Sequence, residues 1–224
     1  MYIKNDLNII LKARDNFEID SKIWNDLDGL KSEILSQIKP STKEKIIYYR
    51  QSDLNNIHEG FFKTDELPAI KTFIGERSKL EYDGALFRHP IPYIILRYKE
   101  KYFFILREKG SGEIRLEGKK GMVGGHVGSE GIIEGMYREL EEEVAVNKSM
   151  IKSLTLKGLI KSNDGVDADH LGCLYEIELN TDKIKAEENG VLSGLWINKK
   201  DLYKHYASFE NWSKIAYHNV LKFE

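Results

Sequence analysis

Three glutamates on one predicted helix are the residues of this sequence best suited to chemistry. They are Glu139, Glu142 and Glu143. Residues three and four positions apart lie within about a hundred degrees of arc on a helix, so the three carboxylates share one ridge. Like charges at this spacing repel by about 0.2–0.5 kcal/mol per pair, and a bound cation reverses that sign. Hard oxygen ligands suit Mg²⁺ or Mn²⁺, which also bind phosphate oxygens.

The helix that carries this ridge is predicted from about Gly131 to Val144, after a glycine-rich turn. Arg138 lies beside the ridge and can pair with a carboxylate to fix its rotamer. An acidic helix chosen at random is usually a solvated surface, so the register of the whole segment carries more weight than the acid run. The opposite side of the helix has an apolar stripe that would pack on a sheet, formed by Ile133, Met136 or Tyr137, Leu140 and Val144.

That register resembles the Nudix hydrolase signature, G-x5-E-x7-R-E-U-x-E-E-x-G-U, where U is an aliphatic residue. In this sequence the pattern starts at Gly124, reaches Glu130 and Arg138, and ends at Val146. Ala145 stands where the signature has a glycine that ends the helix. Because alanine tolerates a positive φ less well than glycine, we expect the helix to end differently here. The family usually counts from the second glycine of a pair, whereas the count here starts at the first.

The resemblance extends from about Gly60 to the C-terminus and is similar to a little-characterised bacterial branch of MutT-type predicted phosphoesterases. It implies a Nudix fold of the α/β (α+β) class, in which a mixed β-sheet is sandwiched between helices. Besides the signature, it rests on the segments Ile91–Ile95, Gly112–Leu116, Gly124–Val127, His170–Gly172 and Glu210–Ser213.

The resemblance implies a Mg²⁺-dependent pyrophosphohydrolase. Its substrate would be a nucleoside diphosphate linked to another moiety, or a related diphosphate. Glu139, Glu142 and Glu143 would bind Mg²⁺, with Mn²⁺ as a possible substitute. One of them, or a carboxylate from a later loop, would act as general base. With Arg138 they form the predicted catalytic set.

Further residues are candidates for binding the substrate or for supplying an extra acid. The predicted phosphate contacts are Gly124, Gly125, His126 and Arg115, and Arg107, Lys119 and Lys120 are further cations of the same region. For His126 a structural role stays open, and for His170 a structural hydrogen bond is favoured. The extra acid is expected at Glu187 or Glu188, with Asp164, Asp167 and Asp169 as rivals.

The resemblance implies a Nudix hydrolase domain over residues 56–224, and residues 1–55 before it are expected to form an N-terminal helical extension. Helical spacing places Ile23, Leu27, Leu30, Ile34 and Ile38 on one face. Residues 41–49 fit either a short helix or a strand, and residues 51–88 indicate loops with short elements. The predicted strands are 93–97, 102–106, 154–160, 171–179 and 194–197, and a last helix spans 209–223.

Composition narrows the class of protein. The 224 residues are 41% hydrophobic and 31% charged, with a formal net charge of −2. The even charge balance argues against a DNA partner, and apolar stretches that are all too short for a membrane helix predict a soluble, cytoplasmic chain. A single cysteine, Cys173, excludes an intrachain disulfide and is expected in the core. The six histidines show no HExxH or HxH spacing, so a zinc hydrolase is not indicated.

Two other functions remain open at this point. The domain could be a non-catalytic nucleotide sensor whose N-terminal extension serves as a dimerisation or output element, and a homodimer is accordingly a possible assembly. Isomerase chemistry on an isoprenoid diphosphate uses a related fold. It would need a catalytic cysteine in a loop, whereas Cys173 is predicted inside a strand.

Overall fold

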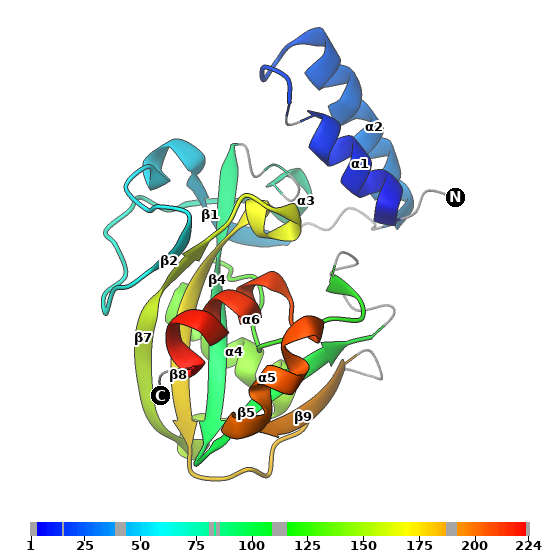
Figure 1. Ribbon diagram of the computed structural model, residues 1–224. Coiled ribbons are helices and arrows are strands. Elements are labelled where there is room, and N and C mark those ends of the chain that lie inside the picture. The colour runs from blue at the N-terminus through cyan, green and yellow to red at the C-terminus, as the bar shows by residue number, and fades with distance from the viewer. Residues whose placement is uncertain are drawn as a thin grey trace.

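The computed structural model describes residues 4–14, 16–38, 44–80, 83, 86–108, 116–186 and 192–222. A mixed sheet lies at its centre (Figure 1). The main path of this sheet runs in the order β2 (Gly60–Phe62), β7 (Ile151–Lys161), β8 (His170–Leu179), β4 (Phe87–Tyr98), β1 (Lys45–Arg50) and β3 (Phe73–Glu76). Three further strands continue from β4, namely β5 (Lys101–Arg107), β6 (Lys120–Gly121) and β9 (Leu192–Asn198).

Strand β4 organises the sheet because it has different partners along its two edges. One edge pairs in parallel with β8 from His89 to Arg97. The other edge pairs with β1 at residues 87–88 and with β5 at residues 96–98, both antiparallel. The sheet therefore splits along this second edge between β1 and β5. The segment around Val123 crosses the split, and the Ile94 N–H donates to the Val123 carbonyl at 2.9 Å.

The two prolines of β4 follow from this split. Ile94 directs its N–H away from β8, toward Val123. Residues two apart in a strand direct their N–H groups to the same edge, so the backbone nitrogens of Pro92 and Pro90 face the split edge and not β8. Proline has no N–H, and at this edge the missing donor breaks no pairing between strands. Because of this, β4 starts at Phe87, earlier than the predicted strand at residue 93.

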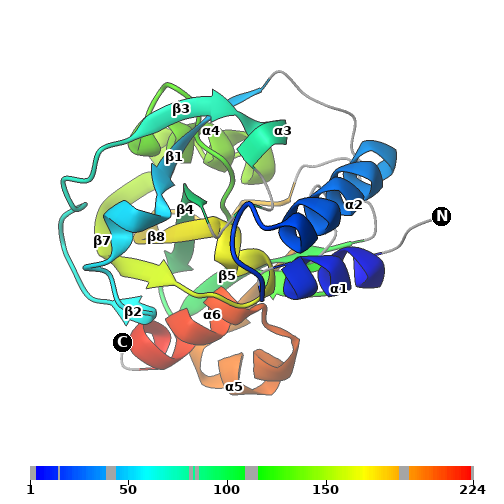
Figure 2. The ribbon, with the colours of Figure 1, turned by 90° about the horizontal axis from the view of Figure 1, so that it is seen from above.

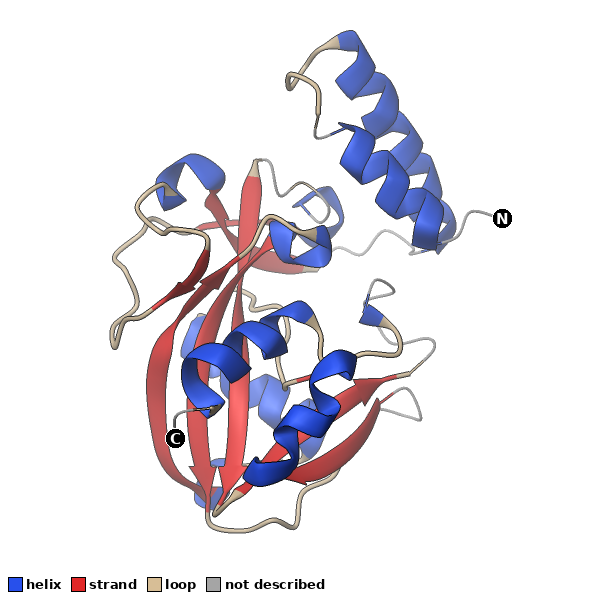
Figure 3. Ribbon diagram, viewed as in Figure 1, coloured by secondary structure: helices blue, strands red, loops and turns tan. Residues whose placement is uncertain are grey.

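Helices cover both faces of the sheet, as the sequence predicted (Figures 1 and 3). On one face, Met136 and Leu140 of α4 (Ile132–Val144) pack with Ile94 of β4. On the other, Phe209 and Trp212 pack with Tyr93. That second layer consists of α5 (Leu202–His205), α6 (Asn211–Ala216) and a π-helical turn (Tyr217–Leu221). The sequence predicted the last helix and missed α5.

Short helical turns join the larger elements. They are α3 (Arg77–Leu80), η1 (Gln51–Leu54), η3 (Lys148–Met150), η4 (Gly165–Asp169), η5 (Lys199–Asp201) and η6 (Tyr206–Ser208). Strand β1 settles the open choice for residues 45–49 in favour of a strand, and it lies inside the sheet. Cys173 is fully buried in β8, as expected, and burial raises the pKa of its thiol to about 12.

The first part of the predicted N-terminal extension forms a helical hairpin of α1 (Lys4–Arg14) and α2 (Lys22–Ile38), which projects from the sheet (Figures 1 and 2), whereas β1 of the same extension pairs with β4. The predicted apolar stripe of α2 is wrong in part, because Ile23 and Leu30 are 50% and 43% exposed. The buried face is rotated and carries Trp24, Lys31 and Ile34.

Ion pairs explain the rotated face of α2. Arg14, which is 1% exposed, donates to Asp28 and Asp83 at 2.8 Å each. Lys31 contacts the same two carboxylates at 2.7 and 3.0 Å. A buried cation is tolerated only when it is paired, so α2 turns Lys31 inward to complete the cluster. Asp83 lies just before β4, so the cluster also joins the hairpin to the rest of the molecule.

Candidate active site

The glutamate ridge forms on α4 as the helical spacing predicted. Met136, Leu140 and Val144 are fully buried against the sheet. Glu139 lies at the margin of this face and is 9% exposed, whereas Glu142 is exposed. Glu139 and Glu143 line a cavity of about 230 Å³.

Arg138 ties the ridge to the loop that precedes it. Its Nη1 donates to Glu139 Oε1 at 2.7 Å and to Glu142 Oε2 at 3.0 Å. Its Nη2 donates to the His126 carbonyl at 2.8 Å and to Glu130 Oε1 at 3.1 Å. A planar guanidinium can hold several acceptors at fixed angles, so Arg138 sets the rotamers of two ridge carboxylates. The ion pairs with these acids raise its pKa, although burial acts in the opposite direction.

Glu130 closes the other end of the loop. Its Oε1 accepts from the Gly128 N–H at 3.1 Å and from Arg138. Burial acts to raise the pKa of Glu130, but backbone N–H groups and Arg138 outweigh it, and the pKa is lowered. Glu130 therefore serves in this structure to hold the loop and Arg138 together.

The glycine pair lets the loop pass close to two other groups. A Cβ at Gly124 would overlap the Pro92 carbonyl oxygen, and a Cβ at Gly125 would overlap the Glu139 carboxylate. The Gly124 N–H also donates to Glu143 Oε2 at 3.4 Å. Gly124 thus requires glycine because it faces a backbone atom, and Gly125 leaves the space that the Glu139 carboxylate occupies.

Glu139 is a ridge acid whose ionisation burial opposes. Desolvation raises its pKa, as does the neighbouring Glu142 charge, and Arg138 offsets only part of this. A divalent cation would reverse the effect by supplying positive charge beside the carboxylates. The three ridge residues offer the carboxylate oxygens that a hard ion such as Mg²⁺ or Mn²⁺ prefers, although only Glu139 and Glu143 of the three line the cavity.

The end of α4 corrects one expectation. Ala145 adopts the left-handed conformation, with φ 53° and ψ 32°; its N–H donates to the Glu141 carbonyl at 3.2 Å, and the Val146 N–H donates to the Leu140 carbonyl at 2.9 Å. The helix therefore ends in the way that a glycine would end it, although alanine was expected to change this. Val144 and Val146 are both buried on either side of Ala145, and this packing fixes the backbone between them.

Two cations line the cavity that the ridge borders. Arg77 pairs with Glu44 at 3.0 Å, and Arg107 lies 3.7 Å from Glu210. The sequence pointed to Arg107 but not to Arg77, whose position depends on the turn α3. Both guanidinium groups can bind a phosphate oxygen bidentately.

Asp167, one of the rival acids, also lines this cavity. Its side chain is 6% exposed and accepts from Asn211 Nδ2 at 2.6 Å. Burial raises its pKa to about 7, with smaller contributions from Glu210 and Asp164. A carboxyl group with a pKa near neutrality in a cavity can exchange protons at physiological pH.

Arg88, which the sequence did not single out, positions the segment that carries Asp167. It is 1% exposed, and its Nη1 donates to the carbonyls of Ser162, Asp167 and His170 at 2.7–3.2 Å. The same guanidinium donates to Gln51 and Asn163. Burial lowers the pKa of Arg88, although its acidic neighbours act to raise it. No local pattern could reveal this role, because all five partners are distant in the chain.

Of the other predicted site residues, the structure describes the two histidines and leaves three residues outside its described ranges. His126 lines the cavity, and its predicted contact with phosphate stays a prediction. His170 makes the expected structural hydrogen bond, from Nδ1 to the Val166 carbonyl at 2.8 Å. Arg115, Glu187 and Glu188 lie outside the described residues. Among the helices of the described residues, none is long and apolar enough to cross a membrane.

Comparison with known proteins gives three informative matches. Protein YmaB of Bacillus subtilis (strain 168) is 29% identical over 146 residues, which cover 58% of this chain and 69% of YmaB. The crystal structure of Tm1382, a protein assigned to the Nudix hydrolases, matches with a TM-score of 0.67 and 25% identity. That match covers 81% of this chain and all of Tm1382.

A third match concerns the fold alone. DR0079 from Deinococcus radiodurans superposes with a TM-score of 0.51 and 14% identity, over 73% of this chain and 99% of DR0079. No protein-family model matches the chain. The match to Tm1382 includes more residues than the sheet and α4 alone, because it spans four fifths of the chain.

Proposed function

We propose that the chain, which is similar in fold to the Nudix hydrolase Tm1382, is a Mg²⁺-dependent pyrophosphohydrolase of that superfamily. Its substrate would be a nucleoside diphosphate linked to another moiety, or a related diphosphate. The observation that carries this proposal is the complete acid ridge, held by Arg138 at the edge of a cavity that also presents two arginines.

The ridge residues Glu139, Glu142 and Glu143 would hold the divalent ion. When bound, such an ion neutralises charge on phosphate oxygens and lowers the pKa of a coordinated water. Arg138 keeps Glu139 and Glu142 in place without lining the cavity itself. Arg138 offsets the repulsion of Glu139 and Glu142, and a bound cation would offset that of all three acids.

The remaining residues of the cavity can bind the substrate and move a proton. Arg77 and Arg107 can contact the two phosphates of a diphosphate. Hydrolysis forms one bond from water oxygen to phosphorus and breaks the bond from that phosphorus to the bridging oxygen. The water gives up a proton, and the bridging oxygen leaves with the other phosphate. Asp167 can accept that proton, because its pKa of about 7 leaves much of it ionised at neutral pH.

A screen for cleaved diphosphates tests this proposal. The chain is incubated with nucleoside diphosphates linked to sugars, nucleosides or alcohols, and alkaline phosphatase then releases phosphate from any monoester product. Cleavage is expected with Mg²⁺ or Mn²⁺ and not after chelation by EDTA, and the EDTA samples are measured by chromatography of the nucleotides because alkaline phosphatase itself needs a metal.

Two outcomes of the screen would contradict the proposal. Turnover that persists in EDTA would exclude dependence on a metal. Binding of one of these compounds, measured calorimetrically, without turnover in any of them would favour the alternative of a nucleotide-sensing module. The double variant Glu142→Gln/Glu143→Gln controls for a contaminating hydrolase, since a contaminant would remain active in that preparation.

A further inference from the structure

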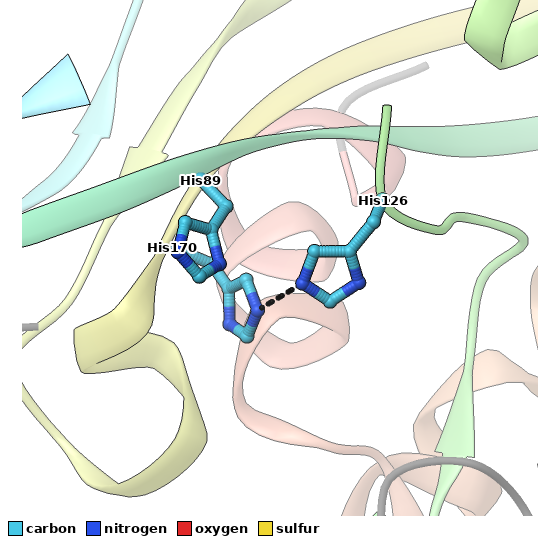
Figure 4. Close-up of side chains that lie close together, drawn as sticks. All are labelled: His89, His126 and His170. Atoms are coloured by element: carbon cyan, nitrogen blue, oxygen red, sulfur yellow. Dashed lines mark hydrogen bonds between the residues drawn. The ribbon is translucent and has the colours of Figure 1, made fainter. Parts of the chain in front are cut away.

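Three histidines from distant parts of the chain meet beside the cavity (Figure 4). His89 lies on β4, His126 follows the glycine pair, and His170 begins β8. One ring nitrogen from each lies within 4.8 Å of those of the other two. The parallel pairing of β4 with β8 places His89 directly opposite His170, and the loop that crosses the split sheet adds His126.

The hydrogen bond of His170 determines which of its ring nitrogens carries the proton and which has a lone pair directed at the cluster. Nδ1 lies 2.8 Å from the Val166 carbonyl, which can only accept, so Nδ1 carries the proton. In the neutral ring Nε2 is then unprotonated, and it points at His126 Nε2 at 3.3 Å. Metal-binding histidines are commonly oriented in this way, by a bond from the other ring nitrogen to a carbonyl or carboxylate.

The separation of the two nitrogens also fits a shared ion. Zn²⁺ binds imidazole at about 2.0–2.1 Å with tetrahedral angles, which places neighbouring nitrogens about 3.3 Å apart. We propose that His89, His126 and His170 form a binding site for a borderline transition-metal ion of the Zn²⁺ class. The three ligands would leave one tetrahedral position for water or for an oxygen of a molecule in the cavity.

This site differs from the glutamate ridge in chemistry and surroundings. Imidazole nitrogens select Zn²⁺-like ions, whereas the ridge offers only oxygens, which suit Mg²⁺. His89 and His170 are 1% and 7% exposed, so the ligands are held rigidly. Arg88 donates to the His170 carbonyl, and the buried carboxyl groups of Asp167 and Asp169 offset its charge.

The test is direct metal binding by the full chain without a polyhistidine tag. The chain is stripped with a chelator and dialysed against Zn²⁺ in the presence of excess Mg²⁺, and bound metal is then measured by mass spectrometry. One tightly bound Zn²⁺ per chain is expected. Co²⁺ in its place should give the visible absorption bands of a tetrahedral site.

His126→Asn is the informative variant, because His126 lies in a loop and is only half-buried. Loss of a mere supporting partner lowers metal affinity about 10–100-fold, so loss of a ligand should lower it by more than about 100-fold. His218→Asn removes an exposed histidine and should leave the Zn²⁺ affinity unchanged. Circular dichroism establishes that each variant is folded. His170→Asn is a second variant that should lower the metal affinity by removing a ligand.

Two results would overturn the site. One is Zn²⁺ binding that is equal in the parent and in both His126→Asn and His170→Asn, which would make the cluster a hydrogen-bonded group only. The other is Zn²⁺ binding that disappears in Glu142→Gln/Glu143→Gln and survives in His126→Asn, which would place the ion on the ridge. Neither readout depends on turnover, so the result is independent of the proposed hydrolase activity.

Discussion

Two groups of polar side chains border the same cavity, and they are built in opposite ways. The glutamate ridge spans five residues of one helix, from Glu139 to Glu143. The buried cluster of Arg88, Asp167 and the three histidines draws on β4, the glycine loop and the start of β8. The first needs only a helix, whereas the second exists only when distant strands pair in register.

The two groups should therefore respond differently to substitution. Glu142 is 60% exposed at its side chain, so its removal affects chemistry more than folding. Asp167 and Arg88 are buried, so changes there alter the free energy of unfolding as well. The following predictions test that contrast, from the largest expected effect to the smallest.

Asp167→Asn should change how stability depends on pH. Burial raises the pKa of Asp167 from about 3.9 unfolded to about 7 folded. Between these values the folded chain keeps a proton that the unfolded chain releases, so stability falls as pH rises from about 4 to 7 and is level above. The asparagine variant lacks this fall. It should gain up to about 4 kcal/mol relative to the parent across that interval.

Chemical denaturation of both proteins at several pH values measures this difference. Asp164→Asn is the matched control, because Asp164 is exposed and nearby. Parallel stability curves for Asp167→Asn and the parent would show that Asp167 titrates normally in the folded chain.

Gly125→Ala tests whether the ridge depends on the loop that faces it. The new Cβ would overlap the Glu139 carboxylate, which must then move. Misplacement of a catalytic group by about 1 Å can cost about 10²-fold, so we expect a loss of that order in kcat. Steady-state kinetics measures it, with Gly29→Ala as control because that Cβ meets no atom within 4 Å. An unchanged kcat would remove Glu139 from the working site.

Arg138→Lys keeps the charge beside the ridge but loses the planar fork. One ammonium cannot hold Glu139, Glu142 and the His126 carbonyl at once. Loss of such a supporting partner typically lowers metal affinity about 10–100-fold, so the Mg²⁺ concentration for half-maximal activity should rise by about that factor. A Mg²⁺ titration that matches the parent would mean that the carboxylates need no such support.

Ala145→Gly should have the smallest effect, and it should stabilise the chain. Ala145 has φ 53°, where alanine costs roughly 1–2 kcal/mol more than glycine. The greater freedom of glycine in the unfolded chain offsets part of this, so a gain of about 1 kcal/mol is expected. Thermal unfolding measures it, and a lower melting temperature would contradict the strain inferred at this position.

The sequence predicted those features that depend on neighbours along the chain. The ridge on α4, the core strands and the position of Cys173 are of this kind. It failed where tertiary contacts decide. Apolar spacing alone placed Ile23 and Leu30 inward on α2, but the ion pairs of Lys31 turn the helix.

The buried cluster was beyond prediction for a similar reason. The local sequence gives no reason to group His126 with His170, because the register of β4 against β8 is needed to bring them to His89. Asp167 was only one of several rival acids, because no local pattern reports its burial. The extra acid expected at Glu187 or Glu188 stays a prediction, as does the division of the chain at residue 55.

The most direct test of the central claim compares two glutamates on the same helix. Glu143 lines the cavity, whereas Glu141 is exposed and is not among the residues that line it. With a substrate from the screen and saturating Mg²⁺, Glu143→Gln should lower kcat by about two to four orders of magnitude. Glu141→Gln should stay within about twofold of the parent, as a surface substitution does. Equal kcat values for the two variants would contradict the assignment of catalysis to this ridge.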